Sequence, residues 1–379
     1  MKGNEEVAEK SPENGKAGRA GFHPVDGMRD WWARAPHWQR YGVYLALIIF
    51  ALILPAPAIG SFMSPDSDWT NVLIFPIGIY ILLAIGLNIV VGHAGMLDLG
   101  FVAFFAIGAY TLATMGTNYG WFVWPTFLVG IVLAAISGVI LGAPTLRLRG
   151  DYLAIVTLGF GEIVRITANN TDAIGGARGI TNIPHPEPLL GTEFLLDAAP
   201  YYYLILAAIV IAIIFSVRLQ KSRVGRAWAA IREDEDAAEL MGVPTFKFKL
   251  LAFAIGAMIG GLAGGVHASK AVFIAPENFP FILSATILAA VVLGGAGNLP
   301  GVILGAFLVA WLPERFRDFA EYRILVFGGV LVLMMALKPE GLLPSRQRKA
   351  ELREGTGGMG AMGAEVAGPD SEASAEVTK

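Results

Sequence analysis

The chain has 379 residues, a mean hydropathy of +0.59 and a net charge of −3, with 55% hydrophobic and only 16% charged residues. A soluble domain usually carries about a quarter charged residues, so the composition excludes an ordinary globular protein and indicates an all-α, polytopic membrane protein. The small net charge gives no reason to expect a nucleic-acid partner. The absence of cysteine excludes disulfides, thiolate nucleophiles and Cys-ligated metals.

Ten apolar segments are candidates for crossing the lipid bilayer, and they fill a membrane domain predicted at 41–340. A polar N-terminal extension at 1–40, without a recognisable cleavable signal peptide, precedes this domain, and a disordered tail is predicted at 341–379. The segment 301–313 is shorter than the bilayer and follows a glycine-rich link, so we predict a broken element together with 281–297. We therefore expect about eight to ten transmembrane or broken helices. The candidate segments are residues 42–59, 71–91, 94–116, 122–143, 152–168, 201–217, 250–269, 281–297, 301–313 and 324–337.

Basic residues cluster before the first of these segments and after the fourth, sixth and last, which places them on one side of the membrane if the chain crosses ten times. The positive-inside rule makes that side the cytoplasm and predicts that both termini are cytoplasmic. Arg315, Arg317 and Arg323 would then lie outside, together with nearby acidic residues. The connection at 169–200 would face outward as a structured loop, either as a simple connector or as a contact for an external partner.

Glycines at four-residue spacing lie in several segments and predict that helix backbones approach one another closely. The alternative is that some of these glycines open a smooth pore or let a helix bend. The spaced glycines are Gly138 and Gly142; Gly256, Gly260 and Gly264; and Gly297, Gly301 and Gly305.

Asp98 is the clearest ionisable residue at membrane depth, within the sequence GHAGMLDLGF at 92–101. A carboxylate there is costly, so we expect it either to anchor irregular backbone between the flanking glycines or to belong to a transport path or proton site. We favour the anchor. Glu162 and Arg165 lie three residues apart and are predicted to pair on one helical face.

Motifs for catalysis are missing from the sequence. It contains no Walker motif, so any ATP hydrolysis is expected in another polypeptide. It contains no Ser-His-Asp or G-x-S-x-G signal for acyl transfer, and its five histidines show no paired metal-ligand spacing. We therefore expect no catalytic residue, no cofactor and no metal in this chain.

A charged stretch at 218–249 separates two long apolar runs and must form a water-exposed loop. Two short helices are predicted in it, the first with an apolar face of Ala227, Trp228 and Ile231 and the second opened by the acidic run 233–236. The alternative is an amphipathic connector that rests on lipid headgroups. An anionic leaflet would repel the acids, so a protein partner fits the loop better.

Four stretches of the chain resemble the permease subunits of ATP-binding-cassette importers for branched-chain amino acids, specifically those of the LivM type. The resemblance covers roughly residues 70–345, nearly all of the membrane part. The stretches are GLNIVVGHAGMLDLGFVAFFAIGAYTLA at 86–113, LRLRGDYLAIVTLGFGEIVRI at 146–166, SRVGRAWAAIREDEDAAELMGVPTFKFKLLAFAIGAMIGGLAGG at 222–265, and VVLGGAGNLPGVILGA at 291–306.

The resemblance implies a transport subunit, not an enzyme, in the plasma membrane of a bacterium or archaeon. Its implied partners are a LivH-type second permease subunit, two cytoplasmic ATPase subunits that use the ATP, and an extracytoplasmic substrate-binding protein. The cytoplasmic loop 219–247 would carry the coupling helices that dock on the ATPase. Aspartate in place of Ala227 or Ile231 is then expected to abolish uptake and leave membrane insertion intact. Carried over by position, the ATPase contacts would be Gly225, Arg226, Ala227, Ala230, Ile231, Arg232, Glu233, Asp234, Ala237 and Ala238.

Two alternatives to this function stay open and a third is set aside. A permease of the same type that carries urea or short amides shares the same motifs. An ion-coupled secondary transporter would use Asp98 as its coupling carboxylate, although the charged loop argues against it. A membrane-embedded enzyme is set aside because no segment contains a nucleophile, a metal cluster or an acid pair.

Overall fold

The computed structural model describes residues 49–56, 60, 68–146, 150–188, 193–194, 197–315, 328–329, 332 and 341–343. The chain divides into two units, residues 1–51 and 52–379, and all that follows concerns the described residues of the second. The extension predicted at 1–40, nearly all of the tail predicted at 341–379, and most of the segments predicted at 42–59 and 324–337 lie outside the described residues.

The first membrane helix that the structure describes is a kinked helix from Trp69 to His93. A kink divides it at Phe75, whose backbone leaves the helical region with φ −137° and ψ 123°. The segment predicted at 71–91 is confirmed. The helix consists of α4 (Trp69–Val72), the π-helical turn η1 (Leu73–Gly78), α5 (Ile79–Leu87) and the π-helical turn η2 (Asn88–His93).

Helices also occupy the other predicted segments between 94 and 313. The prediction for 94–116 is wrong at its start, because residues 94–101 are irregular and the helix begins only at Val102. The helices are α6 (Val102–Tyr119), α7 (Val123–Thr145), α8 (Asp151–Asn170), α9 (Ala198–Gln220), α12 (Thr245–Ala271), α13 (Phe281–Gly294) and α14 (Leu299–Arg315). Within the described part of the chain, five stretches are long and apolar enough to cross a bilayer: Trp69–His93, Val123–Thr145, Ala198–Gln220, Thr245–Ala271 and Pro276–Gly294. The predicted polytopic α-helical membrane protein is therefore confirmed.

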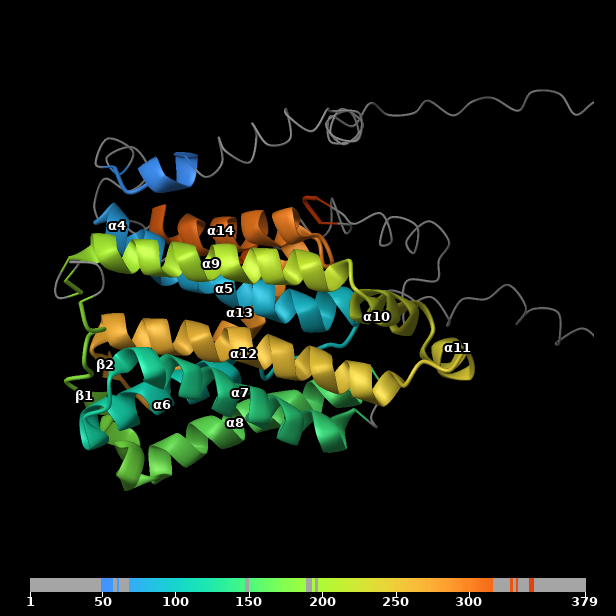
Figure 1. Ribbon diagram of the computed structural model, residues 1–379, viewed down its shortest axis with the longest axis horizontal. Coiled ribbons are helices and arrows are strands. Elements are labelled where there is room, and N and C mark those ends of the chain that lie inside the picture. Colours follow the sequence, from blue (N-terminus) through green and yellow to red (C-terminus); the bar gives the residue numbers. More distant parts are fainter. Residues whose placement is uncertain are drawn as a thin grey trace, which may run out of the picture. The chain divides into compact units, whose positions relative to one another are not determined.

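Helix α12 lies at the centre of the packing, in contact with α5, α6 and α7 (Figure 1). A Cβ atom at Gly264 would overlap with the carbonyl oxygen of Phe105 in α6. A Cβ atom at Gly138 of α7 would lie 2.8 Å from the Cβ of Ala257 in α12. Because backbones touch neighbouring helices at these positions, the predicted close approach is confirmed for Gly138 and for the glycine ladder at 256–264.

Helices α13 and α14 form an antiparallel hairpin joined by a turn at 295–298. A Cβ atom at Gly301 would overlap with the Gly294 carbonyl oxygen, so the two backbones touch close to this turn. The predicted pairing of the two segments is confirmed. The expected place of Gly297 in a helical ladder is wrong, because this residue lies in the turn with φ +85° and α14 begins after it.

The connection between α8 and α9 is folded where the structure describes it, as predicted for a structured loop. Its strand β1 pairs antiparallel with a short strand that follows α12, with Ile180 opposite Ile274. The pairing fastens the loop to the end of α12. The connection contains the 3-10 turns η3 (Asp172–Ile174) and η4 (Gly176–Arg178) and the strand β1 (Ile180–Thr181). The strand β2 (Phe273–Ile274) and the 3-10 turn η5 (Pro276–Asn278) follow α12.

Candidate functional site

Two short helices, α10 (Arg223–Glu233) and α11 (Glu235–Leu240), form the charged loop between α9 and α12, as predicted (Figure 1). Ser222 caps α10, because its hydroxyl oxygen accepts hydrogen bonds from two backbone N–H groups of the first turn, at 3.1 and 3.4 Å. Asp234 caps α11 in the same way, with a bond of 2.9 Å. Glu233, expected at the start of the second helix, instead ends the first.

The apolar face of α10 is buried inside this chain, and the partner contact expected of it stays a prediction. Trp228 is 0% exposed, and Ala227 and Ile231 are also buried. The Trp228 Nε1 donates a hydrogen bond of 2.7 Å to the Phe248 carbonyl oxygen in α12. Aspartate at Ala227 or Ile231 would therefore disrupt the packing of the chain itself, so these substitutions do not test partner docking alone.

A second polar link fastens α11 to the same helix. The buried Lys249 near the start of α12 forms an ion pair with Glu235 in the first turn of α11. Ala238 of α11 is buried as well. Both short helices are therefore attached to α12 by side-chain contacts.

Arg232 also points into its own chain. It comes from the last turn of α10, and its Nη1 donates a hydrogen bond to the carbonyl oxygen of Gly92 at the end of the first membrane helix. Among the ten residues expected to contact an ATPase, the structure thus turns this guanidinium and three buried side chains, those of Ala227, Ile231 and Ala238, away from the loop surface.

The remaining members of the set lie at the surface. Arg226, Glu233, Asp234 and Ala237 are exposed, whereas Gly225 and Ala230 are half-buried. The acidic side chains of Asp236 and Glu239 add to the same exposed surface. The surface is therefore acidic over 233–239, which is unfavourable next to an anionic lipid headgroup layer and favours a protein contact there.

Sequence reasoning missed the most exposed apolar residues of the loop, Leu240 and Met241. They are 89% and 84% exposed at the end of α11. Gly242 follows with φ +83°, a backbone conformation that favours glycine, and ends the helix. Their position as two large apolar residues within a charged, water-exposed stretch could have identified them in the sequence as an apolar surface at the end of the loop, called the apolar tip below. Large exposed apolar side chains surrounded by charges are typical of a protein contact.

Asp98 lies in the irregular segment 94–101 and is 0% exposed. Its Oδ1 accepts a hydrogen bond of 2.8 Å from the Gly100 backbone N–H. The segment is also held by side-chain hydroxyls of two helices, since Leu99 N donates to Thr157 Oγ1 at 3.0 Å and Val102 N donates to the Ser284 hydroxyl at 2.9 Å. The carboxylate thus accepts a hydrogen bond from a backbone N–H group that lies outside any helix, as expected of an anchor. A role of Asp98 in transport stays a prediction.

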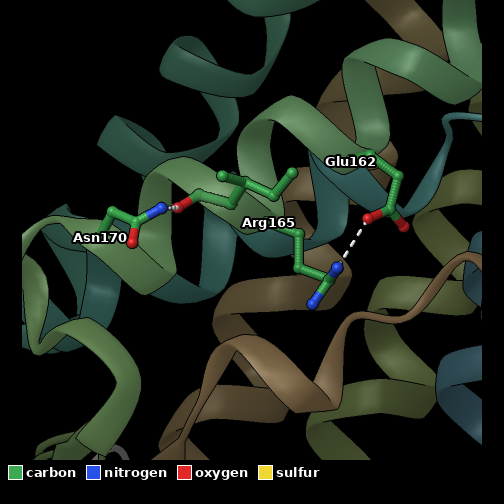
Figure 2. A network of polar contacts seen from close by, with 4 residues as sticks. Glu162, Arg165 and Asn170 are labelled. Carbon is green, nitrogen blue, oxygen red and sulfur yellow. Dashed lines mark hydrogen bonds and ion pairs between the residues drawn. The ribbon is translucent and has the colours of Figure 1, made fainter.

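The predicted pair of Glu162 and Arg165 on α8 is confirmed. Figure 2 shows the two side chains side by side, with 2.8 Å between the guanidinium and carboxylate groups. Each side chain is about a third exposed. The ion pair lowers the free-energy cost of placing two charged side chains on a helix of this membrane bundle. One turn further along, Asn170 Nδ2 donates a hydrogen bond of 3.0 Å to the Ile166 carbonyl oxygen.

Comparison with known proteins gives one family. A model described as the permease component of branched-chain amino acid transport systems matches residues 71–335. The high-affinity branched-chain amino acid transport system permease protein LivM of Escherichia coli K12 is 45% identical over 300 residues, covering 73% of this chain and 70% of the relative. The probable LivM of Methanocaldococcus jannaschii is 26% identical over 74% of this chain and 94% of its own. The LivH permease of E. coli K12 is 26% identical over 70% of this chain and 91% of its own. No solved structure matches the chain.

Proposed function

Because this chain belongs to the family of permease components of branched-chain amino acid transport systems, we propose that it is the permease subunit of an ATP-binding-cassette importer. The cargo we propose is branched-chain amino acids, moved into the cytoplasm. The chain is a multi-pass membrane protein, and its relatives are transport subunits, not enzymes. One observation carries the proposal: a folded, charged loop with an apolar tip is fastened to the membrane helices of a permease.

The loop suits contact with a separate ATPase. Its exposed side carries acids and the apolar tip of Leu240 and Met241, which together offer charge and apolar area to a partner. Its buried side is linked to α12 through Trp228 and Lys249. A displacement of the loop surface by a closing ATPase pair would therefore reach the membrane helices. The ATP would be bound and hydrolysed by two such cytoplasmic subunits, not by this chain.

A second permease subunit of the LivH type would complete the passage. The chain is similar both to LivM and, more distantly, to LivH proteins, so the two subunits of such a pair would share one fold. A substrate-binding protein outside the membrane would deliver the cargo to the connection between α8 and α9. We place the assembly in a bacterial or archaeal plasma membrane, with the α10–α11 loop and both termini in the cytoplasm.

Reconstitution tests this function directly. The chain would be purified in mild detergent with the proteins that co-elute, then placed in liposomes with the external binding protein and labelled leucine. Uptake that needs ATP inside the vesicles, and that isoleucine and valine compete, is the expected result. Uptake that follows a proton gradient without ATP would contradict the importer. Transport of urea or short amides in place of leucine would contradict the cargo.

A further inference from the structure

Arg232 lies where three distant parts of the chain meet. From α10 it reaches the carbonyl oxygen of Gly92, at the end of the Trp69–His93 helix. In the α13–α14 turn, the Gly297 backbone N–H donates a hydrogen bond of 2.8 Å to the side-chain oxygen of Asn88, one turn before Gly92. The loop helix, the end of the first membrane helix and the hairpin turn are thus joined by two polar links.

Glycines make room for this junction. A Cβ atom at Gly95 would lie 2.9 Å from Arg232 Cγ, and one at Gly297 would lie 3.0 Å both from the guanidinium and from the Gly92 carbonyl oxygen. Gly95 and Gly297 also have positive φ angles of 72° and 85°. The arginine stem therefore packs between two backbone turns that larger residues would close or strain.

Both turns are breaks between helices. Gly92 leads into the irregular segment 94–101, which connects the first helix to α6, and Gly297 lies between α13 and α14. Backbone at such breaks can change its φ and ψ angles without disrupting a helical ladder, so these are the places where helices can reorient. Arg232 contacts one break directly and is close to the other.

We infer that Arg232 is a positioning residue that transmits movement of α10 to both helix breaks. The inference deepens the proposed function, on which it rests, by naming the connection between docking and reorientation. Arginine suits this task, because its planar guanidinium offers several fixed donors, and a cation is stabilised by the carbonyl groups at a helix C-terminus. Lysine would bring a single, flexible ammonium group to the same carbonyl oxygen.

The first test separates ATP hydrolysis from transport in the reconstituted complex. Arg232→Ala and Arg232→Gln are expected to keep the ATPase bound and hydrolysing, while leucine taken up per ATP falls by about tenfold or more, the factor for losing a hydrogen bond from a charged donor. Arg232→Lys should recover part of the loss. Arg223→Gln removes an exposed cation from the same helix and should leave the ratio unchanged.

A covalent link gives a second readout that does not depend on the arginine. The chain has no cysteine, so the pair Gly95→Cys and Arg232→Cys would be the only thiols in it. A Cβ at Gly95 would lie 3.3 Å from the Arg232 Cβ, near the distance of about 3.5–4.5 Å in disulfides. With the pair reduced, uptake per ATP should be low; oxidation should restore it, because the disulfide again makes α10 and segment 94–101 move together.

The outcomes distinguish this inference from the proposed function. If the wild-type complex takes up no leucine with ATP, the proposed function itself fails. If the wild type transports and the Arg232 variants keep its uptake per ATP, the transmission role is wrong. Loss of ATPase binding in these variants would assign Arg232 to docking instead. A disulfide that forms and lowers uptake further would show that α10 and the break must separate, which also overturns the inference.

Discussion

The indole Nε1 of Trp228 donates a hydrogen bond of 2.7 Å to the backbone carbonyl oxygen of Phe248, across the connection between α10 and α12. The indole is fully buried, so the bond is shielded from water. It fixes the orientation of α10 at the start of the central helix of the bundle. A stretch that is polar in sequence is therefore fastened to the membrane helices through a buried side chain.

Trp228 should be the main stabilising residue of the loop. Trp228→Ala is expected to lower the free energy of unfolding by about 3–5 kcal/mol, because it removes a fully buried aromatic side chain and leaves a cavity. Trp228→Phe keeps an aromatic ring in the same place and loses the hydrogen bond, so it should lower the free energy of unfolding by about 1 kcal/mol. Thermal unfolding of the purified protein in detergent measures both. Equal midpoints for Trp228→Ala and the wild type would contradict the role.

The apolar tip should matter for partner binding and not for folding. Leu240→Asp or Met241→Asp is expected to weaken binding of the ATPase by about thirtyfold, which is about 2 kcal/mol for an interface hot spot. Both side chains are exposed, so the unfolding midpoint should not change. Co-purification and titration with the ATPase measure the effect. Leu240→Met keeps the tip apolar and serves as the matched control; unimpaired binding of both aspartate variants would exclude the tip from the interface.

Two glycines of the membrane helices should respond in opposite ways to alanine. Gly264→Ala would place a methyl group against the Phe105 carbonyl oxygen, so we expect a loss of about 1–3 kcal/mol in stability from overpacking. Gly159 in α8 has nothing within 4 Å of the added methyl group. Gly159→Ala should therefore be neutral or stabilising by up to about 1 kcal/mol, through helix propensity. Unfolding midpoints in detergent decide; a stable Gly264→Ala protein would contradict the close contact of α12 with α6.

Asp98 allows a test of anchor against proton carrier. Asp98→Asn keeps an oxygen that can accept from the Gly100 N–H, so uptake and stability are expected to stay near those of the wild type. Asp98→Ala removes the acceptor and should destabilise the protein by about 1–3 kcal/mol, because a buried N–H is left unpaired. ATP-driven leucine uptake and thermal unfolding measure the two effects. Loss of uptake in a stable Asp98→Asn protein would favour a carboxylate that takes part in transport.

His185 should make the connection between α8 and α9 sensitive to acid. The Tyr201 hydroxyl donates to the Ser269 carbonyl oxygen at 2.9 Å, so the His185 Nδ1, 2.6 Å from the hydroxyl oxygen, donates to it. Burial lowers the pKa of His185 below its ordinary value of 6.5; a hydrogen bond with the Ser269 backbone opposes this in part, and the positive charge of Lys270 adds a smaller lowering.

The sign of the effect follows from this lowered pKa. As the pH falls below 6.5, the unfolded chain binds the proton before the folded one, so the free energy of unfolding decreases until the pH passes the lowered pKa of the folded state. Above 6.5 the stabilisation is fully present. Unfolding midpoints of the wild type and of His185→Gln, compared on both sides of this pH, should show the acid-induced decrease only in the wild type. A parallel decrease in both proteins would assign it to other groups.

Much of the helical architecture could be predicted because lipid imposes simple rules. Apolar runs of bilayer length predicted the positions of α5, α7, α9 and α12, and the charged stretch predicted two helices outside the membrane. Irregular backbone around Asp98 was predicted from the flanking glycines, but the start of the helix was not, since residues 94–101 were assigned to the membrane segment 94–116. Partners distant in sequence help to hold this break, because hydroxyls of α8 and α13 accept hydrogen bonds from Leu99 N and from Val102 N at the start of α6.

The sequence by itself determined the class of protein, the paired charges on α8 and the need for a water-exposed loop, because hydropathy and local spacing depend on neighbouring residues alone. The tertiary structure decided which side of that loop is available. Ala227, Trp228 and Ile231 look like a docking face in a helical projection, yet they are buried within the chain, Trp228 in a hydrogen bond with Phe248 of α12, and Arg232 turns toward Gly92. The reason is physical: a side chain is exposed or buried according to what folds against it, and no periodicity in α10 reports the approach of a helix that begins later in the chain.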